Sequence, residues 1–504
     1  MPLEVPTAVE AAAFHRLEWL DYSMIGAYFT ATVWMAFVFS RRQHSAEEYF
    51  LGGRRMPWFA VGLSLMATLT STVSYLATPG EVVKYGIIGA MGGLVFYPFI
   101  YLVIAYGLIP VFLRLRVTSI YEYLEQRFDV GTRMFASAVF LVVRLSWMGL
   151  VLFSSTMALA QITQLDRLLI LAVIGLIAVV YTTLGGMRAV IWTDVAQFFI
   201  LFGGALFTVA FVAAETGTGP GAWLEAMAAA DRPGQPVFSF DPFERVTLVG
   251  MGLLGFFWYV CTYAGDQVAV QRLMSTASAR SARWSSACDL ISGLLVTLAL
   301  AAVGMALYAY YQGQPPADAD QAFPYFIRSQ LPRGLAGLVV AALFSAAMSS
   351  LDSGMNSVAT VISVDYVERW RSTPLAAGAQ LLLARVLTVA VGLSSILMCL
   401  ALFLIPEDIR GNLLELAQRV SSFPVGGLGG LFLSAIWVRR CTGPIAVQAT
   451  CAGMLFGLVV GWGHTFGVFP EERPPSFMWI IPSSCLVTLL YAVLVSAVRP
   501  RGAG

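Results

Sequence analysis

The sequence predicts an all-α polytopic membrane protein, and its hydrophobic content, its long apolar runs and the placement of its arginines carry that prediction. Of 504 residues, 58% are hydrophobic and 12% are charged, whereas soluble domains are roughly 45–50% apolar and about 25% charged. One helix needs roughly 20 apolar residues to cross about 30 Å of hydrocarbon. A net charge of +1 gives no reason to expect a nucleic-acid partner.

Thirteen apolar runs long enough to span a membrane follow one another along the chain. They cover residues 22–40, 58–78, 87–113, 134–160, 165–184, 189–213, 246–270, 285–311, 335–364, 375–405, 412–437, 443–466 and 477–497. The first run has neither the basic start nor the cleavage site of a secretory signal, so it is predicted to be an uncleaved span. No intervening loop is long enough for a separate domain, and residues 1–504 are predicted to form a single membrane domain.

Arginine supplies 29 of the 30 basic residues, and its distribution predicts the topology. Loops on one side of the predicted membrane contain 18 basic residues, and loops on the other side contain 9. Because basic loops stay in the cytoplasm, the N-terminus is predicted outside and the C-terminus inside. A missed or invented span would reverse this bias midway along the chain, so the unbroken bias supports thirteen transmembrane helices.

The second and the seventh spans are interrupted. The second is rich in serine and threonine before Pro79 and Gly80, and the seventh breaks its apolar run at Tyr263–Asp266. Unwound backbone is tolerated in a membrane only where it lines a cavity or binds an ion. Close helix packing would explain either span alone, but two interrupted helices five spans apart predict inverted repeats with a site between them.

Ionisable side chains inside the predicted spans are few, and each is a candidate functional residue because burying a charge in a membrane is costly. Arg144 either pairs with a carboxylate of the protein or receives an anionic substrate group. Asp194 either faces the interior or caps the cytoplasmic end of the sixth span. The other candidates are Asp266 and Asp352 within spans and Asp289, Glu415 and Arg419 nearer helix ends.

One face of the ninth span gathers oxygen-bearing side chains. They recur at i, i+3, i+4, i+7 and i+11, which places them on one side of a helix. They are Ser349, Asp352, Ser353, Asn356 and Thr360. Hydroxyl and carboxylate oxygens suit a hard cation such as Na+, which Asp352 would also help to neutralise. The alternative is that the stripe only forms hydrogen bonds with neighbouring helices.

Four ordered motifs in the chain resemble the sodium:solute symporter family over roughly residues 45 to 440. The resemblance implies a five-plus-five inverted-repeat fold, in which spans 2–6 oppose spans 7–11, and Na+-driven alternating access in the cytoplasmic membrane. The implied core repeats cover about 55–213 and 246–437, with peripheral helices at 22–40, 443–466 and 477–497. The motifs are FLGGRRMPWFAVGLSLMAT (50–68), TLGGMRAVIWTDVAQ (183–197), GDQVAVQR (265–272) and MSSLDSGMNS (348–357).

The resemblance also implies sodium ligands. The shared sodium site would use backbone carbonyls and hydroxyls of Ala67, Thr70, Ala346, Ser349 and Ser350. A second sodium, present in some members, would use Asp194, Asp352 and Ser353. The aspartate at position 352 departs from the serine of the family pattern. It would either strengthen the second site or carry a proton.

Substrate contacts match the family less closely. Sugar carriers of the family use a lysine in span eight, and this chain has no lysine there. Arg144 lies one helical turn from the carboxylate-binding arginine of sialic-acid symporters, so an organic anion is the favoured solute and a sugar is the alternative. The predicted substrate-binding residues are Ser74, Arg144, Tyr259, Thr262, Tyr263 and Gln418.

Two other classes of protein compete with a transporter. A membrane enzyme would need a catalytic constellation, and the sequence contains neither HExxH nor GxSxG, while Tyr263 stands where an intramembrane aspartyl protease needs glycine. A transporter-like sensor would need a separate signalling partner. The expected partners are therefore a small solute, sodium ions and the lipid bilayer, and no enzymatic activity is expected.

Overall fold

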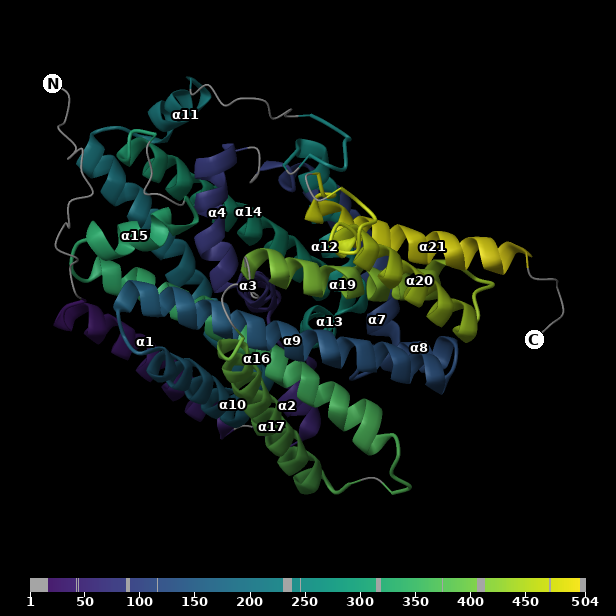
Figure 1. The fold of residues 1–504 in the computed structure, drawn as a ribbon. Helices are drawn as coiled ribbons and strands as arrows, with labels where there is room; N and C mark the ends of the chain where they lie inside the picture. Colours follow the sequence, from purple (N-terminus) through teal and green to yellow (C-terminus); the bar gives the residue numbers. More distant parts are fainter. Residues whose placement is uncertain are drawn as a thin grey trace.

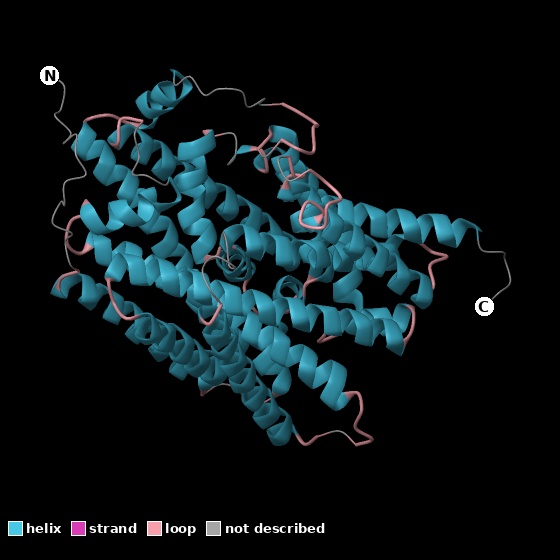
Figure 2. Ribbon diagram, in the orientation of Figure 1, coloured by secondary structure: helices cyan, strands magenta, loops and turns pink. Residues whose placement is uncertain are grey.

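The computed structural model describes residues 17–41, 43, 45–87, 91–115, 117–229, 238–244, 246–313, 319–373, 375–405, 413–470 and 473–498, without the side chains of 320 and 413–420. Within these ranges the chain is helical and contains no β-strand (Figure 2). Met56 and Thr276 form an isolated backbone bridge. The structure therefore confirms the all-α class.

The first half of the chain forms helices that follow the predicted spans. They are α1 (Trp19–Ser40), α2 (Ala46–Leu51), η1 (Gly52–Arg54), α3 (Trp58–Leu69), α4 (Thr72–Tyr85), η2 (Leu94–Phe96), α6 (Tyr97–Leu102), the π-helical η3 (Val103–Leu108), α7 (Ile109–Leu115), α8 (Tyr121–Arg127), α9 (Val130–Thr163), α10 (Arg167–Thr216) and α11 (Pro220–Ala229).

The second half is built in the same way. Its helices are α12 (Leu248–Gly265), α13 (Gln267–Met274), α14 (Ala279–Tyr310), η4 (Ala319–Gln321), α15 (Ala322–Ser329), α16 (Leu335–Val361), the π-helical η5 (Ile362–Glu368), α17 (Ala377–Phe403), α19 (Leu413–Trp437), α20 (Gly443–Trp462), η6 (Phe477–Trp479) and α21 (Ile480–Val498). The described helices include ten that are long and apolar enough to cross a membrane.

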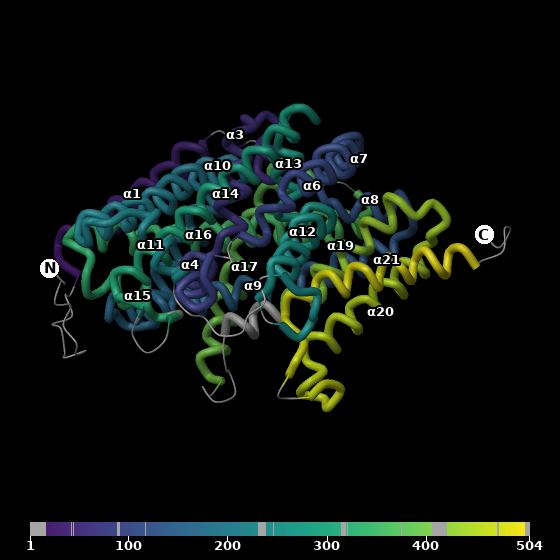
Figure 3. Tube along the Cα trace, turned by 90° about the horizontal axis from the view of Figure 1, so that it is seen from above, coloured from purple at the N-terminus to yellow at the C-terminus, as the bar shows by residue number. Residues whose placement is uncertain are grey.

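Helix α16 is the buried centre of the bundle, and α1 lies at its edge (Figure 1). In their most apolar segments, 89% of the residues are buried for the helix that begins with α16, against 17% for α1. The small residues and hydroxyls of α16 let neighbouring helices approach closely. Helices α20 and α21 pack against α19 and form a flank that carries the C-terminal end of the described chain (Figure 3).

The fifth and sixth predicted spans are continuous in the structure, because α10 runs through residues 167–216 with a kink at Gly186. Gly186 has φ 55°, and a Cβ there would meet the Tyr49 backbone oxygen at 2.8 Å. Only glycine tolerates both the left-handed conformation and that approach. The predicted loop at residues 185–188 is therefore a sharp bend between two helical limbs.

Candidate functional site

The second predicted span is broken, as expected, between α3 and α4. The two helices meet at 69°, and Thr70 and Ser71 at the junction have extended backbones. The Ser71 hydroxyl accepts a hydrogen bond from the Ser74 backbone N–H at 3.3 Å and so caps α4. The last carbonyls of α3 end inside the bundle at this break, where they lack the partners that a continuous helix would supply.

The seventh predicted span is broken in the same manner at Asp266, which separates α12 from α13. One carboxylate oxygen of Asp266 accepts from the Val268 backbone N–H at 2.9 Å and caps α13. Its other carboxylate oxygen accepts from an Nη atom of Arg144 on α9. Asp266 thus ends one helix, begins the next and fixes a guanidinium against the break.

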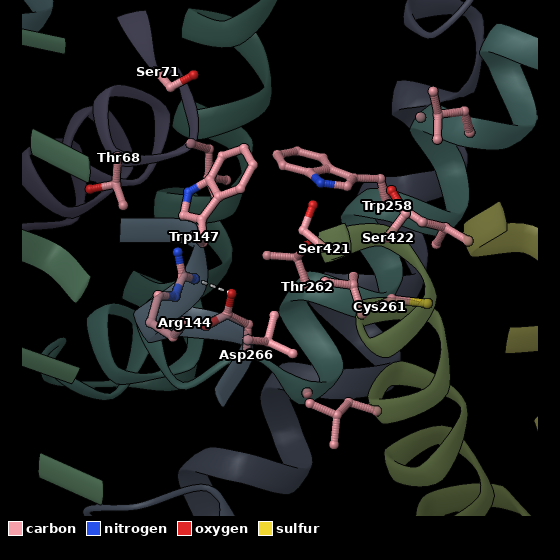
Figure 4. A pocket seen from close by; sticks show the side chains of 18 of the residues that line it. Thr68, Ser71, Arg144, Trp147, Trp258, Cys261, Thr262, Asp266, Ser421 and Ser422 are labelled. Carbon is pink, nitrogen blue, oxygen red and sulfur yellow. Dashed lines mark hydrogen bonds and ion pairs between the residues drawn. The ribbon is translucent and has the colours of Figure 1, made fainter. Parts of the chain in front are cut away.

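A cavity of about 320 Å³ lies between α4, α9, α12 and α19, beside both breaks. In Figure 4, Trp147 and Trp258 face each other across this space, and the Arg144–Asp266 pair lies beside Trp147. Volumes near the lower end of the ligand-pocket range accommodate a small solute. The cavity lining includes the predicted residues Ser74, Arg144 and Thr262, together with Phe140, Trp147, Trp258, Asp266, Ser421 and Ser422.

Arg144 pairs with a carboxylate of the protein, as the first of the two predicted roles for this arginine requires. The pair is not sealed, since the side chains of Arg144 and Asp266 keep 12% and 18% of their exposure. Among the described contacts, Asp266 engages one terminal nitrogen of Arg144. A guanidinium has five N–H donors, so others are available to the cavity.

Other predicted substrate residues are placed elsewhere. The Tyr259 hydroxyl lies 3.4 Å from that of Tyr97, and the Tyr263 hydroxyl donates to Asp289 at 2.5 Å; neither tyrosine lines the cavity. The side chain of Gln418 lies outside the described residues, as do those of Glu415 and Arg419.

Sequence reasoning missed the two tryptophans of the cavity and did not assign Asp266 to the site. Trp147 follows Arg144 by three residues on α9, so the two share one helix face. That spacing is a signal that the sequence contains. Trp258 carries a similar signal, because it precedes the predicted residue Thr262 by four positions on α12 and therefore shares its helix face.

Asp194 is the centre of a second polar cluster, which joins α3, α10, α13 and α16. It is fully buried, so its interpretation as an interfacial cap is wrong. Its Oδ1 accepts from the Ser349 hydroxyl at 2.5 Å. Its Oδ2 accepts from Ser64 at 2.5 Å, from Thr68 at 3.3 Å and from Arg272 at 3.3 Å.

Arg272 lies just beyond the seventh predicted span (246–270), so the sequence places it in a loop, whereas the structure places it on α13. Its side chain is fully buried and forms an ion pair with Asp194. Its Nε donates to Ser64 at 2.9 Å, and one Nη also donates to Ser353. The apolar-run criterion ended the seventh span before Arg272, because a charged residue lowers hydropathy whether or not it has a buried partner.

The residues predicted for the shared sodium site lie on the two helices that meet near the first break. Ala67 lies in the last turn of α3 and Thr70 at its end, while Ala346, Ser349 and Ser350 lie on α16. The Ser350 hydroxyl donates to the Thr68 backbone oxygen at 3.4 Å, which ties α16 to the end of α3. Carbonyl and hydroxyl oxygens of this kind suit a sodium ion.

The residues predicted for a second sodium are also adjacent, but a guanidinium lies among them. Asp352 accepts from Tyr181 at 2.5 Å and from Ser353 at 2.9 Å, while Ser353 also accepts from Arg272. Further along α16, Gln271 donates to Asn356 at 2.8 Å and to Thr360 at 2.9 Å. That end of the oxygen stripe therefore bonds to a neighbouring helix, as the alternative interpretation held.

A charged cluster at the ends of the helices joins α8 to the start of α9 and the end of η5. Glu125 lies 2.7 Å from Arg133 and 3.0 Å from Arg369. Burial opposes ionisation of Glu125, but the two guanidinium groups prevail and lower its pKa below the ordinary value of 4.5. Arg133 also pairs with Asp365 at 2.5 Å.

Two broken helices, a cavity between them and buried carbonyl and hydroxyl oxygens beside one break define the class of protein as an ion-coupled membrane transporter. The chain belongs to the sodium:solute symporter family, whose model matches residues 49–457. The family membership identifies Na+ as the coupling ion and the protein as a multi-pass transporter of the cell membrane, not an enzyme.

Curated relatives cover most of the chain. The sodium/sialic acid symporter of Proteus mirabilis (strain HI4320) is 28% identical over 90% of this chain and 92% of that relative. The sodium-dependent multivitamin transporter of Oryctolagus cuniculus is 32% identical over 92% of this chain and 73% of its own length.

Solved structures agree with the fold. A Na+-coupled sialic acid symporter in a substrate-bound outward-open state has a TM-score of 0.82, at 25% identity, over 96% of this chain and 98% of that chain. A nucleobase-cation-symport-1 family transporter has a TM-score of 0.59 at 12% identity over 90% of this chain and 94% of that chain, which supports the fold alone.

Proposed function

We propose that the protein imports a small organic anion together with Na+ by alternating access. The observation that carries this proposal is Arg144, a guanidinium in the wall of a cavity bounded by two broken helices. Its planar fork of N–H donors matches the geometry of a carboxylate. Asp266 holds the guanidinium in place through one nitrogen and leaves the remaining donors for a solute.

The size and lining of the cavity support an organic acid. A space of about 320 Å³ between Trp147 and Trp258 would enclose the apolar body of a small molecule while Arg144 receives its charged end. Among the relatives, symporters of sialic acid and of monocarboxylates carry solutes that are acids. The chemistry that these solutes share is one carboxylate on a compact body.

A neutral sugar is the second candidate, and one observation favours it. The Arg144–Asp266 pair carries no net charge, and it presents both donors and an acceptor to the cavity. Sugar hydroxyls could bond to both members. The absence of lysine from the cavity lining removes the contact that sugar carriers of the family are expected to use.

For the first Na+, the proposed ligands are the carbonyls of Ala67, Thr70 and Ala346 and the hydroxyls of Ser349 and Ser350. The end of α3 supplies carbonyls without helical partners, and α16 supplies the hydroxyls opposite them. Binding of Na+ would fix the broken helix against α16. Because the same break borders the cavity through Thr68 and Ser71, ion and solute would each favour binding of the other.

We propose Asp194, Asp352 and Ser353 as the site of a second Na+ because of the net charge of this cluster. The cluster contains two carboxylates and one guanidinium, Arg272, and is fully buried. One further monovalent cation would neutralise it. That cation is either a second Na+ or a proton, and one such ion is the expected limit.

The proposed topology has thirteen spans with the N-terminus outside and the C-terminus inside. Ten long helices, the bent pair α3–α4, a second span from the two limbs of α10 and the helix α19 together account for thirteen. Spans 2–6 would form one inverted repeat and spans 7–11 the other, within a single domain. The breaks in α3–α4 and α12–α13, which open the two halves, support this pairing.

The test is uptake into proteoliposomes that contain the purified full chain. Sialic acid, a monocarboxylate and a neutral sugar are offered as labelled solutes, with an inward Na+ gradient or with K+ in its place. Uptake of an acid that requires the Na+ gradient is expected. Uptake that does not respond to Na+ would sink the proposal, and Na+-dependent uptake of the sugar alone would establish the second candidate.

A thermal-shift screen of the same solutes gives an independent measurement. A ligand that binds the folded state raises the melting temperature. Because ion and solute are proposed to promote each other's binding, the stabilisation by an organic acid should be larger in Na+ than in K+. Equal shifts in both salts would contradict coupling between the two sites.

A further inference from the structure

Asp289 lies deep in α14, although the sequence placed it nearer a helix end. It comes ten residues after the start of α14 at Ala279, which is about 15 Å along the helix axis. Its side chain is fully buried. Next to it in the chain, Cys288 packs against Gly62 of α3 so closely that a Cβ on Gly62 would clash. The carboxyl group therefore lies inside the bundle, beside the broken helix.

The two carboxyl oxygens of Asp289 differ in their hydrogen bonding. The Tyr263 hydroxyl donates to its Oδ2 at 2.5 Å. Its Oδ1 is buried and has no hydrogen-bond partner among the described residues. Within the same part of the chain, no arginine, lysine or histidine forms an ion pair with Asp289. A carboxylate in this position would be a buried charge held by a single hydroxyl.

The groups that surround Asp289 are neutral. The titratable side chains near it are Tyr263 of α12, Cys288 on its own helix, and Tyr259 and Tyr97, whose hydroxyls lie beside Gly293 one turn further along α14. Arg272 of α13 is engaged with Asp194 and Ser353. In the described residues, α3 presents Met66 and Gly62 on this side, and neither titrates. An isolated ionised carboxylate is far more costly to bury than a neutral acid.

We propose that Asp289 is a proton-binding site, with the proton on Oδ1 and with Oδ2 accepting the hydrogen bond of Tyr263. A protonated carboxyl group has one hydroxyl and one carbonyl oxygen, and the two unequal oxygens of Asp289 match these two roles. This site is separate from the sodium ligands, which lie on α3, α10 and α16.

The position of Tyr263 connects the proton to the solute cavity. On α12, Tyr263 donates its hydroxyl hydrogen bond to Asp289, whereas Trp258 and Thr262 line the cavity. Loss of the proton would place a negative charge against the Tyr263 hydroxyl, immediately before the break at Asp266. The protonation of Asp289 would thereby act on the helix that positions the solute, and transport would respond to pH.

Infrared spectroscopy of the purified full chain tests the proposal without a solute. The wild type should show the C=O stretch of a protonated carboxylic acid in its spectrum near neutral pH, and the band should be lost at alkaline pH. Asp289→Asn, which keeps the shape and an acceptor for Tyr263, should lose this band. Tyr263→Phe should keep the band but move it to higher wavenumber, because the carbonyl loses its hydrogen bond.

A matched control separates Asp289 from Asp352, a second buried acid of the bundle. Asp352→Asn should leave the Asp289 band in place. A spectrum with carboxylate bands alone at every pH, with or without Na+, would overturn the proposal, and so would a protonated-acid region of the Asp289→Asn spectrum identical to that of the wild type. A band unmoved in Tyr263→Phe would contradict the assignment of Oδ2 as the carbonyl. None of these outcomes depends on which solute is carried.

Discussion

Two pairs of arginine and aspartate join helices beside the two breaks, and they differ in exposure. Arg272 and Asp194 keep none of their side-chain exposure, whereas Arg144 and Asp266 keep 12% and 18%. Asp194 accepts hydrogen bonds from four side chains. The Arg144 guanidinium has a single described partner and borders a cavity.

The difference teaches that the same residue types take different roles according to burial and the number of partners. A sealed, saturated pair has no donor left for a ligand, so it fixes helices in place. A partly exposed pair keeps unused donors and can exchange them with a solute. Removal of one partner from a sealed pair leaves a charge without compensation, and that loss is more costly than the pair's net contribution.

The largest effect is expected for Arg272→Ala, which leaves Asp194 without its guanidinium. Breaking a buried ion pair costs about 3–5 kcal/mol. The variant should lose most of its folded, monodisperse protein in detergent and melt at a much lower temperature. Arg280→Ala, an exposed arginine at the start of α14, is the control. Equal melting of the two variants would contradict the role assigned to the sealed pair.

Arg144→Gln is expected to change transport more than stability. Glutamine keeps one N–H donor for Asp266 but loses the charge and the fork that would receive a carboxylate. Loss of a charge-assisted hydrogen bond costs about 1.5–3 kcal/mol, which corresponds to about 10-fold to 100-fold in apparent affinity. Na+-driven uptake of an organic acid measures the effect.

Arg167→Gln, an exposed arginine at the start of α10, is the matched control for Arg144→Gln. A neutral solute, if one is carried, should be spared by Arg144→Gln. A variant that loses neutral uptake and keeps anion uptake would end the carboxylate interpretation of the cavity pair.

Ser349→Ala and Ser350→Ala should raise the Na+ concentration needed for half-maximal transport while the protein stays folded. One lost oxygen ligand is worth about 1 kcal/mol, or about fivefold in sodium affinity. Ser345→Ala on the same helix is the control. The sodium dependence of transport is the measurement, and an unchanged dependence in both variants would remove the site assignment.

Glu125→Gln should have the smallest effect, because Glu125 is partly solvated and ion pairs of partly solvated groups contribute up to about 1 kcal/mol. The folded protein holds the pKa of Glu125 below 4.5, so its contribution to stability is present above that pH. It is lost as the pH falls through the lowered pKa. Melting temperatures of wild type and variant should therefore differ at neutral pH and converge in acid.

Several features could be predicted from the sequence because they depend on local composition. The break before α4 follows from a run of serine and threonine, and the break at Asp266 follows from Gly265–Asp266 inside an apolar run. The oxygen stripe on α16 follows from helical spacing alone. These patterns can be recognised without knowing which helices are neighbours.

Other features could not be predicted because they depend on which helices meet. From the sequence, Arg272 is assigned to a loop. Only the structure shows that it contacts Asp194 of α10 and Ser353 of α16. From the sequence, Tyr263 is a candidate for substrate binding. In the structure, the orientation of α12 about its axis directs Tyr263 toward Asp289. Hydropathy records the cost of a polar side chain in a membrane, but not the partner that removes this cost.

The sequence by itself determined the class of the protein, the positions of the helices and the identity of the residues that are out of place in a membrane. These depend on transfer free energies and on helical periodicity, which are properties of short segments. Only the tertiary structure decided which charges are sealed in pairs, which face the cavity and which carboxyl group stands alone. Partner choice is set by helix packing, and packing joins residues more than a hundred positions apart, as it does Arg144 and Asp266.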